Sequence, residues 1–108
     1  MIMIKAIIRP DKSQEVIDAL LEAGYPAITK IDVAGRGQQL GIKVGDIQYD
    51  ELPKTMLLIV TPESEKDIIM KIILKTAKTP PAGAMGDGKI FISEVDEVYT
   101  VSSGFKEV

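Results

Sequence analysis

The order of strand-type and helix-type segments constrains the fold of this chain more than any single motif does. β-Branched or alternating apolar residues, which are typical of strands, occupy residues 1–9, 27–33, 54–61 and 89–93. Apolar residues recur at helical spacing over residues 11–23 and 62–78. Asp11 is the expected cap of the first helix and Gly24 its stop, while Thr61-Pro62-Glu63 begins the second helix. The pattern therefore predicts the order βαββαβ.

This order predicts an α+β fold, the ferredoxin-like sandwich, with one antiparallel sheet and both helices on one face. A further short strand is expected at residues 97–101. The first strand has apolar residues on both parities, which predicts cover on both faces for most of its length. The 108 residues suit a single domain over 1–108.

Composition excludes several classes of function. The chain has no Cys and no His, which removes thiolate nucleophiles, sulfur metal sites and the usual general base. The net charge is −3 and no block of Lys or Arg stands out, so no nucleic-acid partner is expected. The apolar runs are too short for membrane insertion, and no signal-peptide pattern begins the chain, which predicts a cytoplasmic protein.

Three activities known on this fold lack their residues here. An acylphosphatase would need an Asn to orient water, and the chain contains none. A metal-chaperone domain would need a CxxC pair, and an RNA-recognition domain would need aromatic residues on its central strands. The first strand has no aromatic residue, and the fourth has only Phe91.

A long Gly-rich segment, residues 35–53, separates the second and third strands. Its 19 residues exceed the roughly 12–15 at which a loop without secondary structure becomes unusual. Two interpretations stay open: a loop that binds a ligand or partner protein, and a β-ribbon kinked by glycines.

A second Gly-rich segment, residues 79–89, ends in Gly86-Asp87-Gly88-Lys89. Consecutive amides in such a turn can bind an anion, and the lysine adds a positive charge. The spacing of a P-loop is absent. A tight turn between a helix and a strand is the alternative, because Gly-Asp-Gly turns are common.

In combination, these motifs resemble the PII family of trimeric nitrogen-regulatory proteins. The resemblance covers nearly the whole chain and rests on AIIRP at 6–10, GRGQQLG at 35–41, LPK at 52–54, TAKT at 76–79 and GDGKIFI at 86–92. It implies the same ferredoxin-like fold and a sensor that is not an enzyme. Such a sensor binds ATP or ADP, and 2-oxoglutarate together with Mg-ATP, in clefts between the subunits of a homotrimer or a mixed PII assembly.

The resemblance also implies site residues. The nucleotide positions are Ile7, Thr29, Gly35, Arg36, Gly37, Gln39, Val60, Gly86, Asp87, Gly88 and Lys89. The 2-oxoglutarate positions are Arg9, Gln39, Gly41, Lys54 and Gly86, and Gln39 also matches the residue that contacts Mg. The segment at about 35–53 corresponds to the signalling loop that contacts protein targets.

Departures from the family pattern bear on these roles. Thr100 and Ser102 stand where the family usually carries two arginines that clamp the phosphates, and Arg36 is the nearby cation that could compensate. Each lost charge-assisted contact costs about 1.5–3 kcal/mol, so weaker nucleotide binding is expected. The segment before GDGK is also about three residues longer than is usual in the family.

The sequence pattern GRG…GD…YDELPK resembles most the nitrogen-fixation branch of the family, whose members inhibit nitrogenase. Tyr49 is the only tyrosine of the signalling loop and is interpreted as a partner contact rather than a modified residue. Two alternatives remain: a PII-like trimer that serves as an interaction or structural subunit without effector binding, and an unrelated amino-acid-binding regulatory domain of the same fold.

Overall fold

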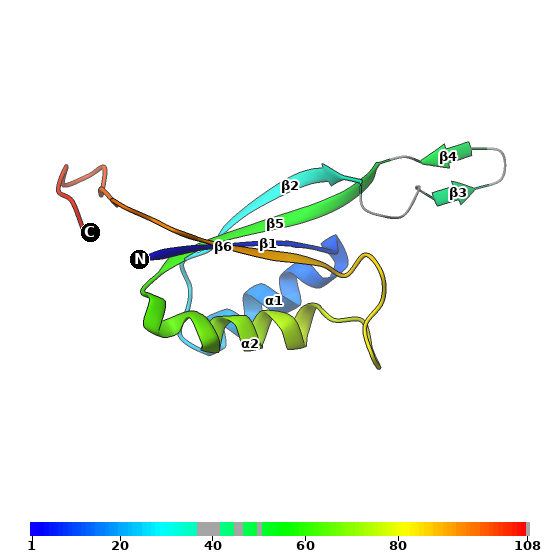
Figure 1. The fold of residues 1–108 in the computed structure, drawn as a ribbon, viewed down its shortest axis with the longest axis horizontal. Coiled ribbons are helices and arrows are strands. Elements are labelled where there is room, and N and C mark those ends of the chain that lie inside the picture. The colour runs from blue at the N-terminus through cyan, green and yellow to red at the C-terminus, as the bar shows by residue number, and fades with distance from the viewer. Residues whose placement is uncertain (37–41, 45–46, 50, 108) are drawn as a thin grey trace.

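The computed structural model describes residues 1–36, 42–44, 47–49 and 51–107 (Figure 1). The elements are β1 (Ile2–Ile8), α1 (Pro10–Glu22), β2 (Thr29–Gly35), β3 (Ile42–Val44), β4 (Ile47–Tyr49), β5 (Leu52–Thr61), the 3₁₀ turn η1 (Glu63–Glu65), α2 (Lys66–Ala77) and β6 (Gly88–Glu94). The main sheet is antiparallel in the order β2-β5-β1-β6, and Figure 1 shows α1 and α2 together on one face. The predicted ferredoxin-like fold is confirmed.

The first helix begins two residues earlier than a cap at Asp11 predicted. Arg9 occupies the N-cap position in an extended conformation, and Pro10 is the first helical residue. Asp11 therefore lies in the first turn and is not the cap, so that prediction was wrong. Proline fits the first turn because its missing N–H would have no partner there. The predicted stop at Gly24 holds, since Gly24 has φ +93° directly after the C-cap Ala23.

The core lies between the sheet and the two helices. Even-numbered residues of β1 and the odd-numbered residues of β5 from Thr55 onward face the helices and are almost fully buried, as are residues of α1 and α2. The largest fully buried apolar side chains are Ile4, Ile8, Leu20, Leu57, Ile69 and Ile73. Burial of each contributes about 1.5–3 kcal/mol to folding, which fixes the sheet against the helices. We call this side of the sheet the covered face.

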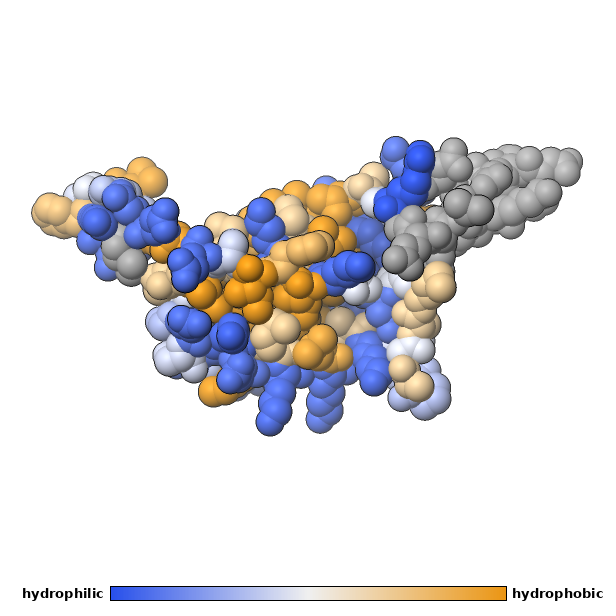
Figure 2. Space-filling model, in the orientation of Figure 1, coloured by the Kyte–Doolittle hydropathy of each residue, from blue (hydrophilic) through white to orange (hydrophobic). Residues whose placement is uncertain are grey.

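The opposite side of the sheet, which we call the open face, is only partly buried within one chain. Met3, Ile7, Met56 and Leu58 point away from the helices and are half-buried, because no element of the described chain lies over them. Two-sided cover of β1 is thus not achieved by the described residues of a single chain. Figure 2 shows apolar residues gathered along the middle of the molecule, above the more hydrophilic helices.

The C-terminal segment differs from the prediction. Instead of a strand at 97–101, the structure has one β-bridge between Tyr99 and Lys106 within a turn. Figure 1 shows this segment extending away from the sheet, so the strand pattern has no neighbouring strand with which to pair. Its apolar side chains are strongly exposed, 98% for Val101 and 76% for Phe105.

The Gly-rich segment 35–53 contains strands where the structure describes it. β2 and β5 pair as far as Gly35 and Leu52, and β3 pairs with β4 in a separate two-stranded antiparallel sheet. This supports the ribbon interpretation for 42–44 and 47–49 (Figure 1). None of the described helices is both long and apolar enough to cross a membrane.

Candidate functional site

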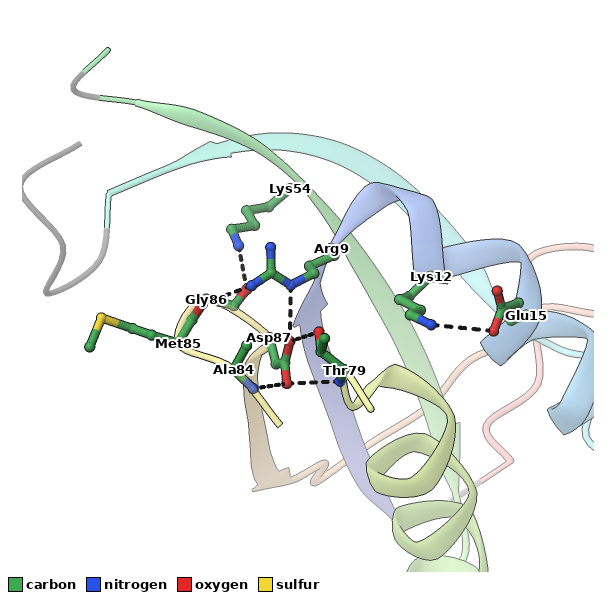
Figure 3. Close-up of polar contacts among 9 residues, drawn as sticks. All are labelled: Arg9, Lys12, Glu15, Lys54, Thr79, Ala84, Met85, Gly86 and Asp87. Atoms are coloured by element: carbon green, nitrogen blue, oxygen red, sulfur yellow. Dashed lines mark hydrogen bonds and ion pairs between the residues drawn. The ribbon is translucent and has the colours of Figure 1, made fainter. Parts of the chain in front are cut away.

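Asp87 organises the loop that joins α2 to β6. Its carboxylate accepts hydrogen bonds from the hydroxyl and the backbone N–H of Thr79, the latter at 3.0 Å. It also accepts the backbone N–H of Ala84 at 2.8 Å and forms an ion pair with Arg9 Nε at 2.9 Å (Figure 3). The same side chain therefore ties both ends of the loop to each other and to the end of β1.

These donors hold the pKa of Asp87 well below its usual range. The Thr79 hydroxyl contributes most, followed by the Thr79 amide; burial opposes them, and Ala84 and Arg9 add smaller contributions that lower the pKa. Asp87 therefore stays ionised, and its carboxylate is used inside the loop. Its backbone N–H is also occupied, because it donates to the Ala84 carbonyl at 3.2 Å. Asp87 shapes the loop; its carboxylate does not project into the open site.

Two cations converge on consecutive carbonyls of the same loop. Arg9 Nη2 donates to the Met85 carbonyl at 2.7 Å, and Lys54 Nζ donates to the Gly86 carbonyl at 2.6 Å. Figure 3 shows Lys54 reaching from β5 and Arg9 from the end of β1 toward Gly86. The sequence placed Arg9, Lys54 and Gly86 in one anion site, and the structure brings these three residues together.

Two cations and two carboxylates act on one another at this corner. Burial lowers the pKa of Lys54, the charge of Arg9 lowers it further, and Asp87 and Asp11 offset part of this effect. A cation held beside another cation gains more from an approaching anion than an isolated one would. A carboxylate or phosphate at this corner of the sheet would relieve the repulsion between Lys54 and Arg9.

The glycines of GDGK are required by their surroundings. Gly88 has φ +122°, and a Cβ there would collide with the carbonyl oxygen of Ile7 on β1. Gly86 has φ +92°, and a Cβ there would lie 3.2 Å from Arg9 Nη2. Both positions thus favour glycine for their positive φ, and Gly88 needs it also for the close approach to the β1 backbone. Lys89 follows in β6 opposite Ile7 and is exposed on the open face.

The predicted adenosine positions lie on one face of the sheet but are far apart along the strands. Register puts Ile7, Thr29, Gly35 and Val60 all on the open face. Gly35 pairs with Leu52 at the start of β5, whereas Val60 lies near its other end, about 27 Å away along the strand. One chain therefore does not bring these four residues around a single adenosine.

Some predicted site residues lie outside the described part of the chain. These are Gly37, Gln39 and Gly41, together with the side chain of Tyr49. Arg36 is described; it follows β2 directly and is exposed. Thr100 and Ser102 belong to the C-terminal turn, which Figure 1 shows at the end of the sheet away from the 79–88 loop.

Thr79 is a site residue that sequence reasoning did not single out. It follows the C-cap of α2, Lys78, and gives Asp87 two of its four contacts. The signal was present, since Thr79 ends the TAKT motif and Asp87 lies in the next motif. What the sequence did not supply was the turn that brings residues 79 and 87 together.

Comparison with known proteins agrees with this geometry. The family described as "Nitrogen regulatory protein P-II" matches residues 1–104 of the chain. The chain belongs to the PII family. It is 60% identical over 104 residues to "Nitrogen fixation nifHD region GlnB-like protein 1" of Methanobacterium ivanovii, covering 96% of both chains. It is 56% identical over 99 residues to the protein of that name in Methanococcus maripaludis, covering 92% of this chain and 91% of the relative.

A further relative of this PII chain carries the general family name. "Nitrogen regulatory protein P-II 2" of Methanothermobacter thermautotrophicus is 47% identical over 105 residues, covering 94% of this chain and 89% of the relative. The present chain is thus a GlnB-like nitrogen regulatory protein. The residues of the Arg9–Lys54–Gly86 corner all lie within the matched range, as do the motifs AIIRP and GDGK.

Proposed function

We propose that this PII protein senses adenine nucleotide and 2-oxoglutarate and controls a protein target through the signalling loop at about 35–53. The observation that carries the proposal is the pair of cations at Gly86. Arg9 and Lys54 each donate to a loop carbonyl, and the pKa of Lys54 is lowered by burial and by Arg9. A dicarboxylate such as 2-oxoglutarate has the charge to bind between them.

We further propose that the nucleotide binds between copies of the chain, as part of a homotrimer or a mixed PII assembly. The separation of Gly35, at the end of β2, from Val60, near the other end of β5, supports this, because residues from two copies can line one cleft. The incompletely buried open face supports it as well, since apolar residues there are available to pack against another copy. Mg would accompany ATP at Gln39.

Isothermal titration with ATP, ADP and 2-oxoglutarate, singly and with Mg, tests the sensing. Lys54→Gln should weaken 2-oxoglutarate by about tenfold or more, because one charge-assisted contact is lost. The matched control is Lys30→Gln, which removes the same charge from exposed Lys30 in β2. Affinity should also fall as the pH rises through the lowered pKa of Lys54, where the ammonium loses its proton. Equal affinities of the two variants would contradict the proposal.

The relatives' names support a target in nitrogen fixation, and we propose nitrogenase or an associated protein. A binding assay with purified nitrogenase, with and without Mg-ATP and 2-oxoglutarate, tests this. An effector-dependent change in binding is expected. If the affinity for nitrogenase is the same with and without both effectors, the sensing role is rejected and the interaction is retained.

A second candidate is an interaction or structural subunit that has lost effector binding. Thr100 and Ser102, in place of two expected arginines, favour it, because neither side chain carries a charge for the phosphates. This candidate is favoured if isothermal titration detects no binding heat with ATP, ADP or 2-oxoglutarate while the protein still binds its target.

A further inference from the structure

A hollow of about 1000 Å³ lies beside the 79–88 loop, on the helix side of the sheet. Its walls are the C-terminal half of α2, the segment from residue 78 to 85, and the start of β6. Ile8, Ile73 and Ala77 contribute to its lining, although each is almost fully buried by its neighbours. The hollow is thus bounded by three elements that the core holds in place.

This hollow lies mainly on the other side of the sheet from the predicted adenosine positions. Ile8 lines it and belongs to the covered face, whereas Ile7, a predicted adenosine residue, points to the open face. The hollow and the predicted nucleotide site share Asp87, Gly88 and Lys89, but Arg9, Lys54 and Gly86 do not line the hollow. The carboxylate of Asp87 is already satisfied by Thr79, Ala84 and Arg9.

The walls of the hollow are mostly apolar. Leu74 on α2 is 57% exposed, and Met85 on the loop is 67% exposed. The loop adds Pro80, Pro81 and Ala82, and β6 adds Ile90. Since exposed apolar groups of this size gain by burial, the hollow favours a ligand with an apolar body.

Three lysines of α2 and its C-cap border the hollow. Lys71, Lys75 and Lys78 are spaced so that they line one side of the helix, and all are exposed. None of them joins an ion pair or side-chain hydrogen bond among the described residues. The Lys78 stem passes close to Gly83, with its Cε 3.2 Å from the position of a Cβ there. A positive rim therefore borders the apolar interior on the α2 side.

We propose that this hollow binds a small, soluble anionic amphiphile, a molecule with an apolar body and one carboxylate or phosphate head. The apolar body fits the Leu74–Met85–Ile90 lining, and the head pairs with the lysine rim. The volume lies at the upper end of the range of small-molecule sites, about 300–1,000 Å³, which favours a small ligand over a partner helix. The proposal goes beyond the sensing function, because it concerns the opposite face of the sheet.

Titration of the full chain with dodecanoate, below its micelle-forming concentration, tests the proposal. Saturable binding of about one molecule per chain is expected. Acetate lacks the apolar body and dodecyltrimethylammonium has the wrong charge, so neither should bind measurably. No binding of dodecanoate, or equal binding of the cationic amphiphile, would overturn the proposal.

Variants locate the site. Leu74→Glu puts a negative charge on the apolar wall, and Lys75→Glu reverses one charge of the rim; each should weaken dodecanoate by about tenfold. Both residues are exposed, so the fold should be retained, as circular dichroism would verify. The matched control is Lys66→Glu, at the far end of α2 and outside the hollow, which should bind as the parent does. A Lys66→Glu loss equal to that of Lys75→Glu would mean nonspecific charge attraction and would reject the site.

Titration of ATP and 2-oxoglutarate in the presence of saturating dodecanoate separates the two sites. We expect both effectors to retain at least part of their binding, because Ile7, Arg9 and Lys54 do not line the hollow, although Asp87, Gly88 and Lys89 do. Strict competition, in which dodecanoate abolishes effector binding, would show that the amphiphile occupies the effector site and would reject the separate hollow. Failure of ATP to bind at all would affect only the proposed sensing function.

Discussion

The two faces of the sheet differ although they are built from similar residues. Leu57 and Leu58 are neighbours on β5, yet Leu57 is fully buried against the helices and Leu58 is only half-buried on the open face. The covered face is therefore closed within one chain over β1 and most of β5. The open face keeps apolar area that another copy of the chain would cover in the proposed assembly. The exposed apolar residues of the C-terminal segment also favour contact with another copy.

Leu57→Ala should produce the largest effect. Truncation of this buried side chain leaves a cavity and should lower the free energy of unfolding by about 2–5 kcal/mol. Urea unfolding followed by circular dichroism would measure it. The loss should be the same in dilute and concentrated samples, because it belongs to the single chain. A loss below 1 kcal/mol, a threshold under roughly half the usual cost, would mean that the covered face is not the main core.

Asp87→Asn should have an intermediate effect at the corner where the two faces meet. The amide keeps one acceptor but loses the ion pair with Arg9, which predicts a loss of about 1–3 kcal/mol. Because the pKa of Asp87 is lowered on folding, its contribution is present above the usual value of 3.8 and is lost as the pH falls below it.

The Asp87→Asn variant should therefore differ from the parent most at neutral pH and least in strong acid. Thermal unfolding at a series of pH values tests this. Thr79→Ser, which keeps the hydroxyl donor, is the matched control and should follow the parent curve closely. A constant difference between Asp87→Asn and the parent at every pH would contradict the assigned role of the ionised carboxylate.

Leu58→Ala should have the smallest effect on the single chain and a separate effect on assembly. At low protein concentration it should cost less than Leu57→Ala, because Leu58 is only half-buried. As concentration rises, the difference from the parent should grow, since an assembly stabilises its folded subunits by mass action. Sedimentation at the same concentrations would report the oligomer directly. A cost that stays the same at every concentration, with an unchanged oligomer, would remove the open face from the proposed interface.

The sequence predicted the order of elements because each long segment had one clear period. Its errors lie where local signals compete or where a partner is needed. Asp11 is a good cap by type, but Pro10 can itself begin a helix, and the helix therefore starts before it. The pattern at 97–101 is strand-like, but a strand forms only beside another strand, and the described chain offers only one bridge there.

The site was predictable where motifs named its residues. Arg9, Lys54 and Gly86 were expected together and are joined by hydrogen bonds at the loop carbonyls. The role of Thr79 was not predictable, because it depends on the path of the loop. The hollow was not predictable either, since Ile8, Leu74 and Ile90 come together only through the packing of β1, α2 and β6.

The bonds between Thr79 and Asp87 turn residues 80–86 into a closed handle on the surface. Both ends of the handle are fixed to each other and, through Arg9, to β1. Gly88 is held against β1 independently of the path that residues 80–84 take. A residue inserted between Pro80 and Ala84 would therefore lengthen the handle and leave the corner of Arg9, Lys54 and Gly86 in place.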